Sequence, residues 1–298
     1  MKPYQSVVTF ALSVAAVSGA TLWALASATE SDIRGHRVAV VNAGARAASP
    51  TPGTLSLAAL PAPVQRYFKF VFPGTAPQAT HVDITMQGQF RRPKTQGFTP
   101  TTAEQTIAVG TPALVFSATT PIVPGVWARA YDAYVDGRMD MKAKVLSAVA
   151  VVNESSSPEL DRISLRRWLL ESPLYPMALL PGGPVRWESI DDHRARAVVT
   201  YNGLSASLVA TFAGDGRLLR FDAEEDGDLT TSYHGSGEHV ARDDYQLVDG
   251  IRVPMKFVIA RAAGGKLYPF WDGRVTAIRF SRAGTSEMKS ARDLHVLQ

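Results

Sequence analysis

The sequence predicts a mainly β protein of the α+β class. We expect a large curved antiparallel sheet or open half-barrel, about two helices packed across it, and an apolar helix at the N-terminus. Turn signals such as Asn202-Gly203 and Asp249-Gly250 separate short strand-like segments throughout the C-terminal half. Short connections are typical of antiparallel neighbours, and a sheet of about a dozen strands curves rather than staying flat.

Residues 1–28 are predicted to form a signal peptide or a membrane anchor. Lys2 precedes an apolar stretch from Val7 to Ala28, and a membrane-spanning helix needs about 20 such residues. Ala26-Ser27-Ala28 instead matches a signal-peptide cleavage site. Both alternatives stay open, and both predict export to the cell envelope, periplasmic or extracytoplasmic, because the positive end stays inside. The membrane is therefore an expected partner of this N-terminal segment.

The rest of the chain is predicted to contain one domain. Residues 29–57 are rich in Ala, Ser, Thr, Pro and Gly, which is typical of a flexible linker. A single curved-sheet domain is expected at residues 58–283, followed by a tail at 284–298. The absence of cysteine excludes disulfides, thiol catalysis and cysteine-ligated metals. A net charge of +4 without a long run of like charges argues against a nucleic-acid partner.

The domain is predicted to begin with a helix and to continue as strands. Pro63 suits a first helical turn, and Pro73-Gly74 ends the helix. Apolar and polar residues then alternate, which predicts half-buried strands. Asp136-Gly137 predicts a tight hairpin turn into a strand at 138–145. The apolar stripe of the helix is Val64, Tyr67, Phe68 and Val71, and the strands before the turn are 82–86, 103–109, 112–119 and 126–135.

A second helix and a long series of strands are expected after residue 157. Ser157 is a natural N-cap and Pro158 a first-turn residue. Arg167 and Glu171 can form an ion pair at positions i and i+4. The remaining strands are predicted at 185–190, 194–201, 204–213, 217–224, 229–235, 239–247, 251–261 and 274–282.

Three polar clusters resemble catalytic or metal sites, but each is better explained as a turn or a strand end. His234-Gly-Ser-Gly-Glu-His239 is one residue longer than the inverted zinc-protease motif, and its glycines oppose the helix that the motif requires. Residues 222–228 resemble a calcium loop, but Tyr233 stands where its bidentate glutamate is needed. Asp191-Asp-His193 has no accompanying nucleophile. No metal site, cofactor or catalytic residue is therefore predicted.

Aromatic residues and two carboxylates are the candidate ligand-binding residues. In a sheet curved around a helix, the aromatic side chains would line a mostly apolar cavity; otherwise they are ordinary core. A carboxylate within an apolar segment is typical of functional sites, with a structural pair between Glu171 and an arginine as the alternative. The candidates are Trp127, Tyr131, Trp168, Tyr175, Trp187, Phe270, Trp271, Glu104 and Glu171.

Several blocks of residues resemble a bacterial family of exported or membrane-anchored domains of unknown function. The resemblance runs from about Leu60 to Phe280 and implies no catalytic residues. Pro173-Leu174 departs from it, because an aromatic residue is expected before Tyr175-Pro176. The blocks are Glu104-Gln105, Asp132-x-Tyr134-x-Asp136-Gly137, Arg167-Trp-Leu-Leu-Glu171, Tyr175-Pro176, Ala178-Leu-Leu-Pro181, Val185-Arg-Trp187 and Tyr268-Pro-Phe-Trp-Asp-Gly-Arg274.

More distantly, the predicted arrangement is similar to the periplasmic lipoprotein-carrier fold. That resemblance rests on the order of helix, many-stranded sheet and crossing helix, together with Asp249-Gly-Ile-Arg-Val-Pro254. It implies an open barrel that holds acyl chains under helices. Fold alone does not establish function.

We therefore expect a cell-envelope domain that binds a hydrophobic or lipid-like ligand without catalysis. Export, the curved-sheet pattern, the aromatic residues and the missing catalytic motifs favour this function. Two alternatives remain open. One is an envelope enzyme acting on a lipid, glycan or polymer through Glu104, Glu171 or the 234–239 segment. The other is a structural or partner-binding envelope module, for which a large exposed apolar patch would be the sign.

Overall fold

The computed structural model describes residues 3–47, 57–92, 97–230 and 238–282. Within these residues, 13 strands form one antiparallel sheet in the order β6-β5-β4-β3-β2-β1-β13-β12-β11-β10-β9-β8-β7, which stays open between β6 and β7. The predicted fold class is confirmed. The strands are β1 (His81–Phe90), β2 (Thr99–Ala108), β3 (Leu114–Val123), β4 (Val126–Val135), β5 (Arg138–Val145), β6 (Val149–Ser155), β7 (Val185–Ser189), β8 (Arg194–Tyr201), β9 (Leu204–Phe212), β10 (Leu218–Asp222), β11 (Glu238–Val248), β12 (Ile251–Ala263) and β13 (Lys266–Ser281).

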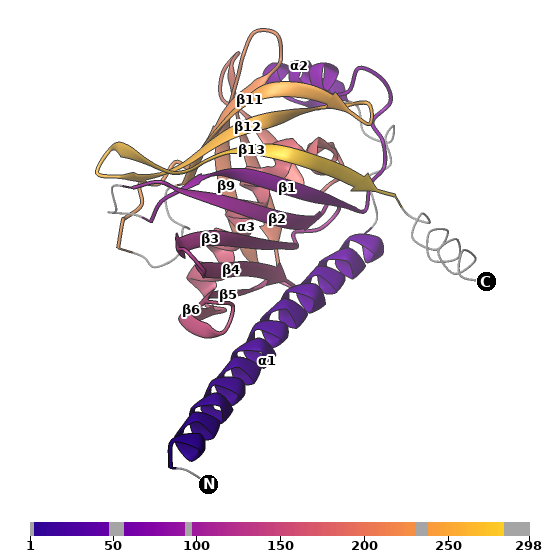
Figure 1. Ribbon diagram of the computed structural model, residues 1–298. Coiled ribbons are helices and arrows are strands. Elements are labelled where there is room, and N and C mark those ends of the chain that lie inside the picture. Colours follow the sequence, from indigo (N-terminus) through magenta and orange to yellow (C-terminus); the bar gives the residue numbers. More distant parts are fainter. Residues whose placement is uncertain (1–2, 48–56, 93–96, 231–237, 283–298) are drawn as a thin grey trace, which may run out of the picture.

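The last strand lies at the centre of the sheet beside the first. β13 returns to pair with β1, with Ser281 opposite His81. The strands β2 to β6 extend from this centre on one side and β12 to β7 on the other (Figure 1). The chain passes from edge strand β6 to edge strand β7 through helix α3 (Pro158–Glu171) and the 3-10 turns η2 (Ser172–Leu174) and η3 (Pro176–Leu179).

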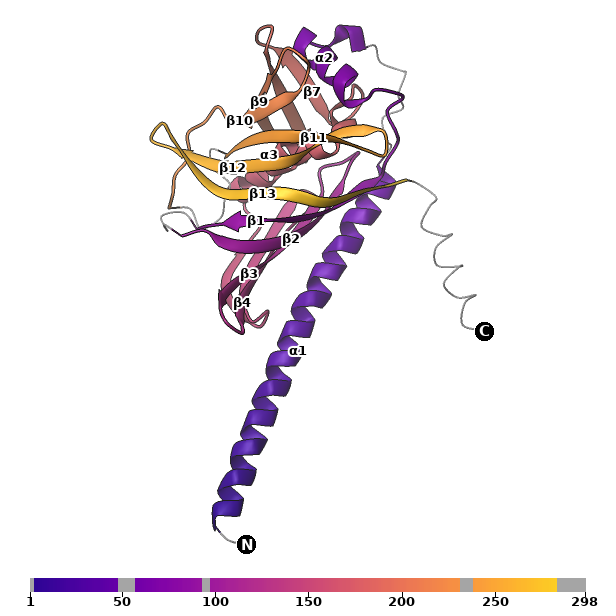
Figure 2. The ribbon, with the colours of Figure 1, turned by 45° about the horizontal axis from the view of Figure 1, so that its top comes forward.

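The sheet curves so strongly that its two arms meet at one end. Asp136 and Gly137 have φ angles of 52° and 78°, which confirms the predicted tight turn between β4 and β5. The side-chain amide of Asn202, in the turn between β8 and β9, donates to the Asp136 carbonyl oxygen at 2.8 Å. Figure 2 shows β7, β9 and β10 on the far side of the curved sheet from β3 and β4.

Helix α3 lies inside this curve. Its predicted N-cap is confirmed, because the Ser157 hydroxyl oxygen accepts from the Leu160 backbone N–H at 3.2 Å. The helix packs on β8 and β9 of one arm and on β4 and β5 of the other. Most of its residues are buried, including Trp168 and Leu169. Burial on nearly all sides explains why α3 lacks the clear polar face of a surface helix.

The predicted ion pair between Arg167 and Glu171 is wrong. Arg167 instead donates to Asp132 on β4, and Glu171 accepts from Arg242 on β11 at 2.7 Å. Because α3 is enclosed by strands, each side chain finds a partner on the sheet rather than on its own helix. The alternative of a structural pair between Glu171 and an arginine is the one that the structure shows.

Helix α2 (Ala62–Val71) covers one end of the domain. It follows the short turn η1 (Leu57–Ala59), and its buried residues match the predicted apolar stripe. Tyr67 packs against Phe212 of β9, with ring centroids 5.6 Å apart. The Arg252 guanidinium donates to the Phe70 carbonyl oxygen at 2.8 Å, which ties the helix to β12.

The N-terminal helix α1 (Pro3–Arg46) continues well beyond the predicted boundary at Ala28. Residues 29–46, expected to be linker, are helical, and residues 48–56 lie outside the described part. The physical reason is burial against the outer face of the sheet. Val40 and Ala43 of α1 form a small apolar cluster with Ala108, Ala113, Val115 and Ala133.

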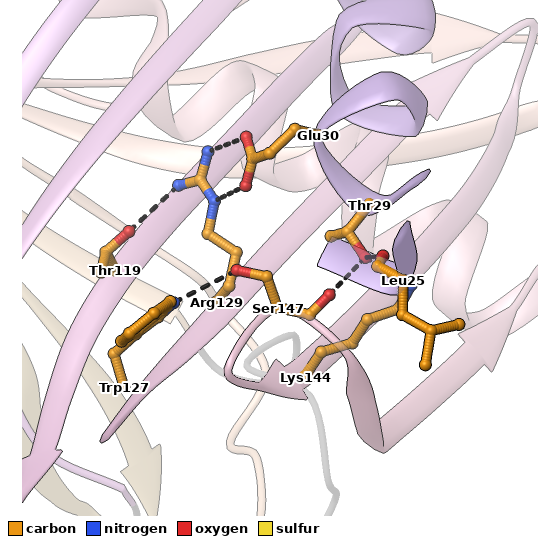
Figure 3. A network of polar contacts seen from close by, with 8 residues as sticks. All are labelled: Leu25, Thr29, Glu30, Thr119, Trp127, Arg129, Lys144 and Ser147. Atoms are coloured by element: carbon orange, nitrogen blue, oxygen red, sulfur yellow. Dashed lines mark hydrogen bonds and ion pairs between the residues drawn. The ribbon is translucent and has the colours of Figure 1, made fainter. Parts of the chain in front are cut away.

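A polar network fixes α1 to this outer face (Figure 3). The Arg129 guanidinium donates twice to the Glu30 carboxylate, at 2.9 and 3.0 Å, in the bidentate geometry that is strongest for this pair. The Thr29 hydroxyl donates to the Ser147 carbonyl oxygen at 2.6 Å, and Lys144 donates to that hydroxyl at 2.8 Å. These contacts hold the helix from Thr29 onward.

The part of α1 before this network projects beyond the sheet (Figure 1). Val17 is 67% exposed and Trp23 is 74% exposed. Measured over the described residues, no helix combines the length and apolarity that crossing a membrane requires.

Two strands differ from the predicted boundaries. β6 was not expected, because Val149–Ser155 is short and lies at an edge, where its side chains are largely exposed. β13 begins at Lys266 rather than at residue 274. In the strand predicted at 229–235, residues 229 and 230 are not in a strand, and residues 231–235 lie outside the described part, as does the predicted tail at 284–298.

Two glycines of α1 provide a matched test of its docking. A Cβ at Gly44 would lie 2.3 Å from the Thr80 carbonyl oxygen, whereas a Cβ at Gly35 would meet nothing within 4 Å. Gly44→Ala should therefore destabilise the protein by about 1–3 kcal/mol through overpacking. Gly35→Ala should stabilise it by about 1 kcal/mol through helix propensity. Thermal unfolding of both variants measures this, and changes of equal sign would contradict the docking of α1.

Candidate ligand cavity

A cavity of about 810 Å³ lies between α3 and the inner face of the sheet. Its walls come from β1 to β6, from β11 to β13 and from α3. Sites for small molecules usually measure roughly 300–1,000 Å³ and are mostly apolar. The larger apolar side chains that line the cavity are Met86, Phe90, Phe116, Met139, Met141, Leu160, Ile163, Leu170, Ile259, Phe270 and Trp271.

A row of alanines leaves this space open. Ala118 of β3, Ala130 of β4 and Ala143 of β5 lie opposite one another in the sheet register. All three line the cavity. Because side chains in register point to the same face of a sheet, larger residues here would fill the space. The sequence carries a signal for this face, since Ala128, Ala130 and Asp132 alternate along β4, although small residues do not by themselves indicate a binding site.

The cavity also contains paired charges. Arg167 donates to the Asp132 carboxylate, and its guanidinium lies 4.6 Å from the centroid of the Phe116 ring. Glu171 accepts from Arg242 at 2.7 Å, and the side chains of both are almost fully buried. Buried charges of this kind are tolerated because they are paired and hydrogen-bonded.

Glu238 is the third carboxylate that lines the cavity, and it takes no part in these two pairs. It lines the cavity from β11 and is only 4% exposed. Its Oε2 atom has no hydrogen-bond partner among the described residues. Burial raises the pKa of Glu238 to about 7, although the positive charges of Arg167, Arg166 and Arg261 oppose this shift.

Three of the predicted ligand-binding residues line the cavity: Phe270, Trp271 and Glu171. Trp168 and Tyr175 belong to the core instead. The Trp168 indole N–H donates to the Ala108 carbonyl oxygen at 3.0 Å, and Tyr175 donates to the Trp168 carbonyl oxygen. Neither side chain has exposed surface with which to contact a ligand.

The other predicted residues lie outside this cavity. Trp187 packs between the rings of Phe212 and Phe221, and its indole N–H donates to the Leu179 carbonyl oxygen at 3.1 Å. Tyr131 points to the outer face, where its ring lies 5.7 Å from that of His36 on α1. Alternation along the strand places Tyr131 and Asp132 on opposite faces.

Glu104 and Trp127 line a second depression, of about 660 Å³, between α1 and the outer face. The Trp127 indole N–H donates to the Ser147 hydroxyl at 3.2 Å (Figure 3). Glu104 is exposed, so the predicted apolar surroundings of this carboxylate are wrong. The adjacent residues Ala103 and Gln105 are buried, because alternate side chains of β2 point to the opposite face of the sheet.

The polar clusters of the sequence are structural where they are described. His239 points away from the cavity and contacts Asp222 at 2.6 Å, while His234 lies outside the described residues. Asp191 accepts from the backbone N–H groups of His193 and Arg194 in a turn. Glu225 pairs with Arg166 at 2.8 Å. The described part of the chain contains no group of three or more His, Asp and Glu residues placed to hold a metal ion.

Glu238 makes stability depend on pH. Its carboxyl pKa is about 7 in the folded chain against an ordinary value of 4.5. As pH rises through this window, the unfolded chain loses the proton first, so the free energy of unfolding falls by about 3 kcal/mol. Glu238→Gln removes this loss. The variant should be more stable than the wild type by up to about 3 kcal/mol at pH 8, with little of this gain at pH 4.5.

Chemical unfolding at both pH values measures the difference. The control is Glu104→Gln, which alters an exposed carboxylate on the outer face. It should show no gain that grows with pH. An equal effect of Glu238→Gln at pH 4.5 and pH 8 would show that Glu238 is not the titrating group.

Comparison with known proteins identifies the family but no activity. A comparison with curated proteins gave no match. Solved structures that are similar include a LolA superfamily protein from Nitrosomonas europaea, 10% identical, with a TM-score of 0.39, covering 77% of this chain and 97% of the other. A DUF1329 family protein from Desulfovibrio piger is 11% identical, with a TM-score of 0.39, covering 75% of this chain and 93% of the other. At such identities the likeness concerns the fold alone.

The family resemblance noted in the sequence is confirmed. The model of a family of unknown function, DUF6920, matches residues 58–280. This range contains the whole sheet except the last residue of β13, together with the helices α2 and α3 that pack against it. The chain belongs to the DUF6920 family.

Proposed function

We propose that the inner cavity binds the apolar part of a hydrophobic or lipid-like ligand. The observation that carries the proposal is the space above the alanine row, defined here as Ala118, Ala130 and Ala143. Apolar walls facing this space are unfavourably hydrated, so an apolar occupant is favoured there. Phe270 and Trp271 supply large flat surfaces to such an occupant.

The rim of the cavity supports the same function. Arg92 and Gly97 are exposed, and Ile122 is 51% exposed. These residues line the cavity while also facing solvent. A ligand therefore has a route of entry that does not require the sheet to open.

We further propose that the protein acts in the cell envelope. The support is Lys2 followed by the apolar stretch from Val7 to Ala28. Thr29, which follows the small-residue site Ala26-Ser27-Ala28, is fully buried against the sheet. The helical docking segment would thus remain with the domain both after cleavage and in an uncleaved, anchored chain.

Binding without chemistry is favoured over catalysis. One observation supports the alternative of an envelope enzyme acting on a lipid, glycan or polymer: a carboxylate with a pKa near neutrality is suited to acid–base work. However, no histidine is found among the described residues that line the cavity. The Ser164 hydroxyl there donates to the Leu160 carbonyl oxygen of its own helix. Turnover of a lipid substrate that is lost in Glu238→Gln would favour the enzyme.

A tryptophan in the alanine row tests the cavity directly. Ala130→Trp should reduce the affinity for the neutral fluorescent probe N-phenyl-1-naphthylamine by about 10-fold or more, because the indole fills the space that the probe needs. Probe fluorescence titrated against the full chain measures this. Ala150→Trp, on the exposed side of β6, is the matched control and should leave binding unchanged.

Thermal unfolding of both variants verifies that they remain folded. Equal probe affinity in a folded Ala130→Trp variant and in the wild type would place binding outside the cavity. No binding of the probe by the wild type would contradict the proposed function itself.

A further inference from the structure

We propose that Glu238 recognises the polar head of the ligand, and that this head is a hydrogen-bond donor, either an ammonium or a hydroxyl group. The inference rests on the proposed function, since it concerns the same cavity. It adds a position for the head group and excludes a class of ligand. Amphiphiles with a carboxylate head are disfavoured by it.

The first support is an imbalance among the charges of the cavity. Asp132, Glu171 and Glu238 are the carboxylates among the described lining residues. The first is held by Arg167 and the second by Arg242. Oε2 of Glu238 has no hydrogen-bond partner in the described part of the chain.

The neighbouring arginines are held in other contacts. Arg167 is bound to Asp132 and stacked over Phe116 at 4.6 Å. Arg166, which is not among the residues lining the cavity, donates to Glu225 at 2.8 Å. Arg261, opposite Glu238 on β12, donates to the Asp228 carbonyl oxygen at 3.3 Å. These arginines attract the charge of Glu238 without satisfying its oxygen. A donor from outside the chain would complete the site.

Burial makes the lack of a hydrogen-bond donor at Oε2 of Glu238 costly. A carboxylate removed from water without a hydrogen bond is strongly destabilised, and a donor that reaches it restores much of the lost free energy. A bond to a charged acceptor is also stronger than one between neutral groups. A carboxylate head would instead place two negative charges side by side and would leave Oε2 unsatisfied.

The position of Glu238 also suits an amphiphile. Glu238 lies on β11, which the strands β2, β1, β13 and β12 separate from the alanine row on β3 to β5. The cavity reaches both places. A ligand that occupies it fully therefore needs an apolar chain along β3 to β5 and a donor group at β11.

Matched amphiphiles test the proposal. Dodecylamine, dodecanol and dodecanoate share one chain length and differ in the head group. Each is used below its micelle concentration, at pH 8, to displace N-phenyl-1-naphthylamine from the full chain. The amine and the alcohol should displace the probe at about 10-fold lower concentration than dodecanoate.

Glu238→Gln should remove this preference. The variant keeps the shape of the side chain but loses its charge, so we expect about 10-fold weaker binding of dodecylamine and tighter binding of dodecanoate. Glu104→Gln, on the outer face, should behave as the wild type. Glu238→Asp is a second variant: it keeps the charge on a shorter side chain and should retain the order of preference with weaker discrimination.

The outcomes separate this proposal from the proposed function. Equal displacement by all three amphiphiles in the wild type, or an unchanged preference in Glu238→Gln, overturns head recognition by Glu238 while the cavity remains a binding site. A preference for dodecanoate in Glu238→Asp overturns it as well. A wild-type chain that binds neither the probe nor any amphiphile, measured by calorimetry, overturns both.

Discussion

An antiparallel sheet of 13 strands seldom persists without curling, splitting into two packed sheets or flattening, and this sheet curls. Here the chain leaves the edge strand β6 as helix α3 and returns as the edge strand β7, so the connection itself lies inside the curve. Trp168 and Leu169 are fully buried as a result. The helix does not fill the curve completely, because the small side chains of the alanine row leave space between α3 and the facing strands. The cavity is the space left between a buried helix and a floor of small side chains.

Placing a helix inside a sheet also determines where charges go. Arg167 and Glu171 cannot extend into water from α3, so each pairs with a strand across the cavity wall. Such pairs contribute little net stability, because desolvation offsets their attraction, but they define the direction in which each side chain points. Glu238 has the same degree of burial without the same pairing. An apolar residue there would avoid the cost of burying an unpaired carboxylate, which makes Glu238 a candidate for a functional role.

Local signals predicted most of the elements, and contacts between distant segments decided the rest. Alternation identified strands such as β4, and the N-cap at Ser157 identified the start of α3. The edge strand β6 escaped prediction because its side chains are mostly exposed, so it carries no clear alternation of burial. The extension of α1 through Arg46 could not be foreseen either, since it depends on the outer face of strands much later in the chain. For the cavity, large aromatic residues were the wrong guide in part: Trp168 fills space, whereas Ala130 creates it.

The pairing of β1 with β13 has a consequence for how the protein acquires its structure. The Thr80 backbone N–H donates to the Ser281 carbonyl oxygen, so the centre of the sheet joins the beginning and the end of the domain. Loop-closure entropy makes such distant pairings slow to form. The two arms can therefore join into one sheet only after the last strand, β13, has been synthesised. The complete sheet is thus a late product of synthesis, and a chain truncated before β13 would lack the strand that joins its two arms.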